Sequence, residues 1–105
     1  MRPVDRSRIA EISAGVWGGN DYLMEVFDSW VSDPGASFQA AEVDGIVVAV
    51  HRLRPIARGV MYYEGLRVAE DHRRRGIGRA MLQEAIREAR GLRFRLVRLY
   101  TGNPQ

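Results

Sequence analysis

The chain of 105 residues contains no cysteine, no lysine and only two histidines. The absence of cysteine excludes disulfide bonds, zinc–thiolate sites and a thiol nucleophile. With so few histidines we also expect no metal centre, because such a centre needs several ligands close together. No apolar run approaches the roughly 20 residues that span a bilayer, and the polar N-terminus differs from a signal peptide. These absences predict a cytoplasmic protein that has no metal and no membrane partner.

Length and composition predict one domain over residues 1–105, because 46% of the residues are hydrophobic and 28% are charged. The charges are unevenly distributed. Residues 1–72 hold 7 arginines and 11 acidic residues (net −4), whereas residues 73–105 hold 9 arginines and 2 acidic residues (net +7). A basic cluster late in the chain predicts that an anion binds there. A phosphorylated small molecule and nucleic acid both fit this charge pattern.

Hydrophobic periodicity predicts the order helix, helix, strand, strand, strand, helix, strand. The expected helices cover 6–14, 23–30 and 76–90, the last ended by Gly91, and the expected strands cover 38–43, 46–53, 60–68 and 94–100. A short strand over 1–4 is expected before them. Asp44-Gly45 is typical of a hairpin turn, residues 54–59 are expected to form a loop, and a helix between the last two strands makes them parallel. We therefore predict an α/β (α+β) fold with a mixed antiparallel and parallel sheet flanked by helices.

The loop between strand 60–68 and the following helix indicates the chemistry. Gly76 and Gly78 stand at the first turn of that helix, where unpaired N–H groups and the helix dipole favour anions. A glycine allows the backbone to approach a phosphate closely. The loop is not a Walker A motif, and Met81 stands where a dinucleotide-binding GxGxxG motif needs its third glycine.

The pattern Arg73-x-x-Gly76-x-Gly78 resembles the acetyl-coenzyme A pyrophosphate loop of the GNAT N-acetyltransferase family. Three neighbouring segments resemble the same family: the strand residues 64–68 (EGLRV), the helix residues 79–82 (RAML) and the strand end 99–103 (LYTGN). Residues 18–23 (GGNDYL) resemble the branch that includes histidine and other amino-acid N-acetyltransferases. The resemblance implies a GNAT-type fold and acetyl-coenzyme A as the cosubstrate.

The resemblance also implies roles for individual residues. Backbone groups of strand 60–68 would bind the pantetheine arm as an added strand would, the loop and first helical turn would hold the pyrophosphate, and the asparagine at the strand end would contact pantetheine. The implied coenzyme-binding residues are Leu66, Arg67, Val68, Arg73, Arg74, Arg75, Gly76, Ile77, Gly78, Arg79 and Asn103.

The implied reaction is direct attack of a primary amine, which an amino acid could provide, on the acetyl thioester. The amine must lose a proton, so a base is needed near neutral pH. Glu64 is the candidate, because burial late on its strand would make the carboxylate a stronger base. A structural carboxylate paired with Arg52 or Arg67 is the alternative reading of Glu64. Tyr22 and His51 are candidate substrate contacts, although either fits an ordinary structural role.

In the resembling family a further helix and two strands follow, and that helix often carries a tyrosine that protonates the leaving thiolate. The resemblance therefore predicts that this chain lacks the final helix and strands, and that a second copy pairs with the exposed edge of strand 94–100 to form a homodimer. Two other functions remain open. One is a truncated module that binds coenzyme A or oligomerises without catalysis. The other is nucleic-acid binding, which no helix-turn-helix, zinc finger or aromatic platform in the sequence supports, so we expect no nucleic-acid partner.

Overall fold

The computed structural model describes residues 1–2, 5–14 and 22–99. Its elements are α1 (Arg6–Ala14), α2 (Leu23–Val31), β1 (Ser37–Val43), β2 (Ile46–Ala57), β3 (Val60–Val68), the 3-10 helix η3 (Glu70–His72), α3 (Ile77–Gly91) and β4 (Leu96–Leu99). The sheet has the order β1-β2-β3-β4, in which the first three strands are antiparallel and the last pair is parallel. This arrangement confirms the predicted mixed sheet and the parallel connection through α3.

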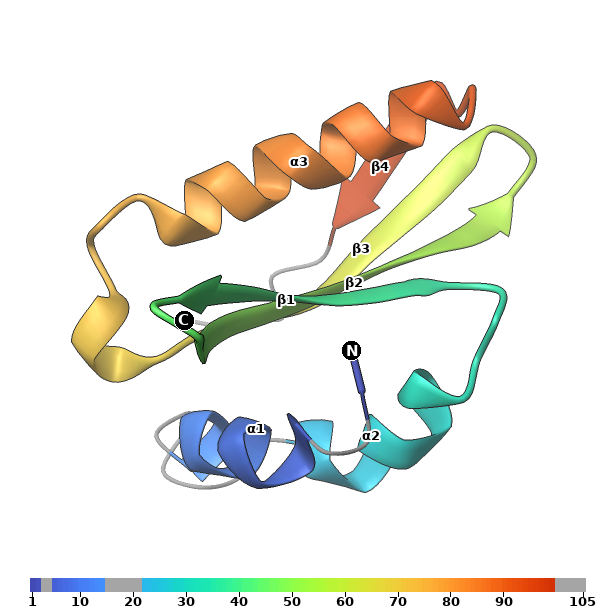
Figure 1. Cartoon of the computed structure of the whole chain (residues 1–105). Helices are drawn as coiled ribbons and strands as arrows, with labels where there is room; N and C mark the ends of the chain where they lie inside the picture. Colours follow the sequence, from blue (N-terminus) through green and yellow to red (C-terminus); the bar gives the residue numbers. More distant parts are fainter. Residues whose placement is uncertain (3–4, 15–21, 100–105) are drawn as a thin grey trace, which may run out of the picture.

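Helices cover both faces of the sheet: α1 and α2 lie on one face and α3 crosses the other (Figure 1). The apolar stripe of α2 explains its position, because Leu23 and Phe27 are fully buried on one side of that helix. On the other face, α3 buries Met81, Ala85 and Ala89 towards the sheet. Burying a side chain the size of Phe27 stabilises the fold by about 1.5–3 kcal/mol.

The hairpin between β1 and β2 forms as predicted. Asp44 and Gly45 both have positive φ, 53° and 80°, which is the backbone that a two-residue turn between twisted antiparallel strands requires. The ladder then runs from Val43–Ile46 to Ser37–Leu53, with one irregularity near Ala41. This hairpin fixes the register of β2 against β1 and therefore the face of the sheet on which each β2 side chain lies.

The prediction that β2 ends at Leu53 and that 54–59 is a loop is wrong. β2 continues to Ala57, and Pro55 pairs with Met61 of β3. The physical reason is that β1 begins at Ser37, opposite Leu53. Beyond Leu53, β2 therefore has β3 as its only neighbouring strand. A proline lacks the N–H that a central strand needs, but an edge position tolerates it.

The end of the described chain also differs from the prediction. α3 includes Gly91, and the left-handed residue after the helix is Arg93 with a φ of 69°. β4 begins at Leu96 rather than at position 94, and Arg95 and Leu96 both donate their backbone N–H to Gly59 O, at 2.9 and 3.2 Å. Position 100 lies outside the described residues.

The expected short strand over 1–4 is only partly described. Residues 1–2 are not in a strand, and residues 3–4 lie outside the described ranges. The N-terminal ammonium of Met1 donates to the carbonyl oxygen of Phe38 in β1 at 2.9 Å. The start of the chain is therefore held beside β1, where Met1 packs against the core cluster that includes Phe27.

Candidate functional site

A bulge in the middle of β3 shapes the candidate site. Gly65 and Leu66 of β3 together oppose His51 of β2, so the ladder between the two strands is interrupted there. Gly65 has a φ of 74°, and a Cβ at this position would lie 2.9 Å from Cζ3 of Trp30. Both the backbone conformation and the contact with the indole require glycine. The bulge changes the course of β3 directly after Glu64.

The parallel pairing of β3 with β4 ends at the same place in the described residues. It joins Val60–Tyr63 to Leu96–Leu99, and Glu64 is the next residue on β3. Glu64 therefore lies directly after the last described pair of the β3–β4 ladder and directly before the bulge at Gly65.

The start of α3 combines open backbone with basic residues. Gly76 precedes the helix with a φ of 79° and, as a glycine, offers no side chain to cap it. The first turn of α3 contains no acidic residue. The N–H groups of such a first turn have no partner within the helix. In the segment before the helix, a cavity of about 300 Å³ is lined by Glu70, Arg73 and Arg74. An added Cβ at Gly76 would meet nothing within 4 Å, so the backbone is open to a ligand there.

The predicted coenzyme-binding segment of β3 lies next to the start of α3. Leu66 O accepts a bond of 2.9 Å from Nη1 of Arg67, and Val68 O accepts one of 3.0 Å from Nε of Arg73. An added Cβ at Gly78 would lie 3.7 Å from Cδ2 of Leu66, so the first turn of α3 packs closely on β3. The structure therefore brings together β3, the loop and the helix start, whereas Asn103 lies outside the described residues.

Glu64 forms the centre of an ion-pair network on the α2 side of the sheet. Its Oε2 atom accepts from Nη1 of Arg52 at 2.7 Å and from Nε of Arg54 at 2.8 Å. Arg52 also donates from Nη2 to Oδ2 of Asp33 at 2.6 Å, and its guanidinium lies over the ring of Trp30. The expected pairing of Glu64 with Arg52 is thus found. Arg54 is not among the residues predicted from the sequence, although a spacing of two residues on one strand places both arginines on the same face.

Within the described part of the chain, three arginines on this side of the sheet stack on aromatic rings at 4.6–5.6 Å. We call the six residues the arginine–aromatic face: Arg52 with Trp30, Arg54 with Tyr62, and Arg67 with Tyr22. The Tyr22 ring also packs edge-to-face against Trp30, with 6.1 Å between the ring centroids. Tyr22, a predicted substrate contact, therefore lies in the same cluster of rings and guanidinium groups as the carboxylate of Glu64.

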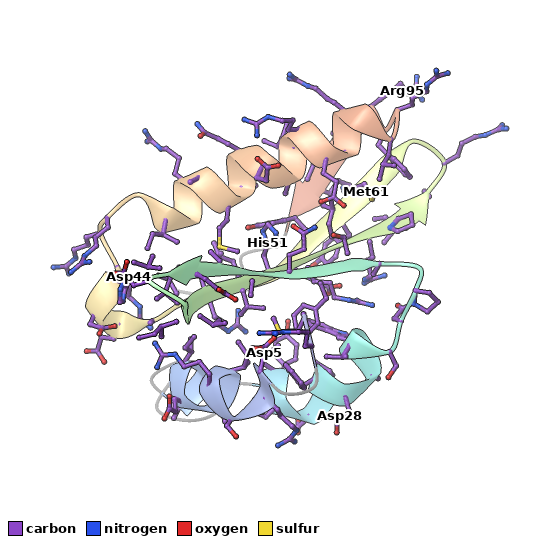
Figure 2. All side chains as sticks on the ribbon, viewed as in Figure 1. Asp5, Asp28, Asp44, His51, Met61 and Arg95 are labelled. Carbon is purple, nitrogen blue, oxygen red and sulfur yellow. The ribbon has the colours of Figure 1, made fainter. Side chains whose placement is uncertain are left out.

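His51, the other predicted substrate contact, lies on the opposite side of the sheet, facing α3 (Figure 2). Its side chain is buried, and Nδ1 lies 3.0 Å from the hydroxyl oxygen of Tyr63. It lines an apolar cavity of about 320 Å³ between the sheet and α3, to which Met81 and Glu84 also contribute. The structure thus separates His51 from Glu64.

Burial makes His51 a pH-dependent element of the fold. Burial lowers the pKa of His51 from 6.5 to about 4, and Glu84 opposes this only in part. Between these two pKa values the unfolded chain binds more protons at this histidine than the folded chain does. The contribution of His51 to folding stability is therefore fully present above pH 6.5 and is lost as the pH falls to about 4. We expect the decrease to reach about 3 kcal/mol.

Urea unfolding at a series of pH values measures this decrease. His51→Asn keeps a polar group near Tyr63 and is expected to flatten the slope between pH 6.5 and 4. His72→Asn serves as the matched control, because His72 pairs with Asp71 at the surface. An equal slope in wild type and His51→Asn would contradict the assignment.

In residues 1–2, 5–14 and 22–99, no group of three or more histidines and acidic residues is arranged to hold a metal ion. No helix within the same part of the chain is long and apolar enough to cross a membrane.

Comparison with known proteins adds independent evidence. Residues 7–105 match the model of the Acetyltransferase (GNAT) family. The human protein described as Probable N-acetyltransferase 16 is 37% identical over 70 residues, which are 66% of this chain and 19% of that protein. A histidine N-acetyltransferase from Oreochromis niloticus is 34% identical over 80 residues, which are 75% of this chain and 24% of that protein. The chain therefore spans about a quarter or less of these relatives.

A solved structure supports the same fold. A GNAT family acetyltransferase from Brucella melitensis, crystallised in complex with acetyl-CoA, matches with a TM-score of 0.80 at 21% identity. The match covers 99% of this chain and 74% of that chain. The likeness confirms the predicted fold class over nearly all of the sequence.

Proposed function

This chain belongs to the GNAT acetyltransferase family, and we propose that it transfers an acetyl group from acetyl-coenzyme A to a primary amine. The observation that carries the proposal is that one strand, β3, connects the start of α3 with the position of Glu64. Its end leads through η3 to the open, basic start of α3, and its bulge positions Glu64 at the end of the described pairing with β4. A coenzyme lying along β3 would place its pyrophosphate at the first site and its thioester near the second.

The chain offers groups that fit the coenzyme. The first-turn N–H groups of α3, together with Arg73, Arg74, Arg75 and Arg79, suit a pyrophosphate. The carbonyl oxygens of Leu66 and Val68 accept bonds from arginine side chains. We infer that these arginines move aside when the pantetheine amides bind to β3.

Glu64 is proposed to accept the proton. The thioester supplies an electrophilic carbonyl carbon and a thiolate leaving group. Glu64 removes one proton from the acceptor ammonium, directly or through water. The neutral nitrogen then forms a bond to the acetyl carbon while the carbon–sulfur bond breaks, and the second nitrogen proton passes through solvent to the departing thiolate, without a covalent enzyme intermediate. Because Arg52 and Arg54 share Oε2, the side chain is held in one orientation towards the acceptor.

A module that binds coenzyme A without turnover is the second candidate. The ion-pair network favours it, because an acceptor ammonium would have to compete with two guanidinium groups for Oε2 of Glu64. Thiol release in the presence of a primary amine distinguishes the two. Homodimerisation through the outer edge of β4 stays a prediction, which light scattering at micromolar concentration tests.

Titration of acetyl-coenzyme A by calorimetry is the first test of the coenzyme site. We expect micromolar affinity for the wild-type chain and a loss of at least about 100-fold for Gly76→Glu. The glutamate adds negative charge at the positive end of α3, and its Cβ disfavours the left-handed backbone at this position.

Gly91→Glu is the matched control, because it makes the same chemical change at the last residue of the same helix. It should bind acetyl-coenzyme A as the wild type does. Equal affinities for the wild type and Gly76→Glu would exclude the start of α3 as the pyrophosphate site.

A further inference from the structure

Arg54 differs from its neighbour Arg52 in how much of it solvent can reach. The side chain of Arg52 is 6% exposed and pairs with two carboxylates, whereas the side chain of Arg54 is 40% exposed. Both contact the same oxygen of Glu64. Arg52 is therefore part of the interior, and Arg54 presents a guanidinium at the surface of the arginine–aromatic face.

Two contacts fix the orientation of the Arg54 guanidinium. Nε donates to Glu64, and the planar group lies over the ring of Tyr62 at 5.1 Å. In the part of the chain that the structure describes, this Nε contact is the ion pair found for Arg54. A guanidinium held through Nε still presents the paired N–H groups of its other two nitrogens, the fork that matches a carboxylate.

We propose that Arg54 binds a carboxylate of the acceptor, and so selects amines that carry one, with α-amino acids as the substrate class. This inference rests on the proposed function, because only that function makes the ligand an acetyl acceptor. An α-amino acid carries its ammonium and its carboxylate on one carbon atom. Glu64 and the guanidinium of Arg54 are in direct contact, so the two charges of the ligand would meet complementary charges at neighbouring positions.

The alternative is that Arg54 only neutralises Glu64. In that case its removal would affect all amines alike, because only the carboxylate of Glu64 would change its environment. A pair of ligands that differ by one carboxylate separates the two roles. Histidine and histamine form such a pair, and tyrosine and tyramine form a second with a different side chain.

The test measures binding without turnover. Each of the four ligands is titrated by calorimetry into the full chain saturated with coenzyme A, which has no acetyl group to transfer. We expect at least one amino acid to bind about 10- to 100-fold more tightly than its decarboxylated amine, the range for a charge-assisted, two-pronged hydrogen bond. Arg54→Gln should abolish this preference, and Arg54→Lys should retain part of it. Arg58→Gln, in the exposed turn after β2, should leave it intact.

The outcomes separate this inference from the proposed function. Equal binding of acid and amine by the wild type, or binding of neither, overturns the inference. An Arg54→Gln variant that weakens acid and amine equally also overturns it and assigns Arg54 to Glu64 alone. Acid preference that depends on Arg54, with no thiol release from acetyl-coenzyme A, would support the carboxylate site and refute acetyl transfer.

Discussion

Glu64→Gln is expected to lower kcat for amine acetylation by about 10²- to 10³-fold at pH 7, within the range typical of a lost general base. The coenzyme affinity measured by calorimetry should stay within about twofold, since Glu64 lies on β3 before the segment that leads to the start of α3. Without the base, only amine that is already deprotonated in solution reacts. The residual rate should therefore rise about tenfold per pH unit up to the pKa of the acceptor.

The matched control is Glu42→Gln, which makes the same change at an exposed position on β1. Its kcat and pH profile should equal those of the wild type. A loss of less than about tenfold in Glu64→Gln, or a variant whose rate has the same pH dependence as the wild type, would show that Glu64 is not the base. A rise in KM with little change in kcat would instead indicate that Glu64 only binds the ammonium.

The fold was predictable where the determinants are local. The apolar stripe of α2, the Asp44-Gly45 turn and the crossover helix α3 each follow from a short stretch of sequence. The extent of β2 was not predictable in this way. Considered alone, Pro55 predicts the end of a strand. Proline is tolerated at this position only because β1 begins opposite Leu53, which leaves Pro55 on an edge of the sheet.

The candidate site shows the same division. Gly76 and the arginines around it form a local pattern, and the structure places them at the open start of α3 as expected. The network around Glu64 depends on the register of two strands: Arg52 pairs with Glu64 and Arg54 with Tyr62 across the ladder. His51 illustrates the opposite case, because alternation along β2 turns it away from the face that carries Arg52. Residue type alone indicated a substrate contact, whereas register determines which face each side chain occupies.

Arg52→Met is expected to destabilise the fold by about 2–4 kcal/mol. Breaking a buried ion pair by removing one partner costs about 3–5 kcal/mol. The loss here should be smaller because Arg54 still bonds Oε2 of Glu64, and because Asp33 is 43% exposed and regains water. The methionine also removes the buried Nε of Arg52, which has no hydrogen-bond partner in the described structure. Urea unfolding measures the change.

A double-mutant cycle with Glu64→Gln identifies the origin of this loss. If the cost arises from a carboxylate left without Arg52, Arg52→Met should destabilise the Glu64→Gln background by at least about 1 kcal/mol less than it destabilises the wild type. Additive effects would assign the loss to the packing of Arg52 on Trp30. Arg58→Met, at an exposed turn position, should change stability by less than about 0.5 kcal/mol. Arg52 would then be the residue that couples the stability of the α2 side of the sheet to the position of the proposed base.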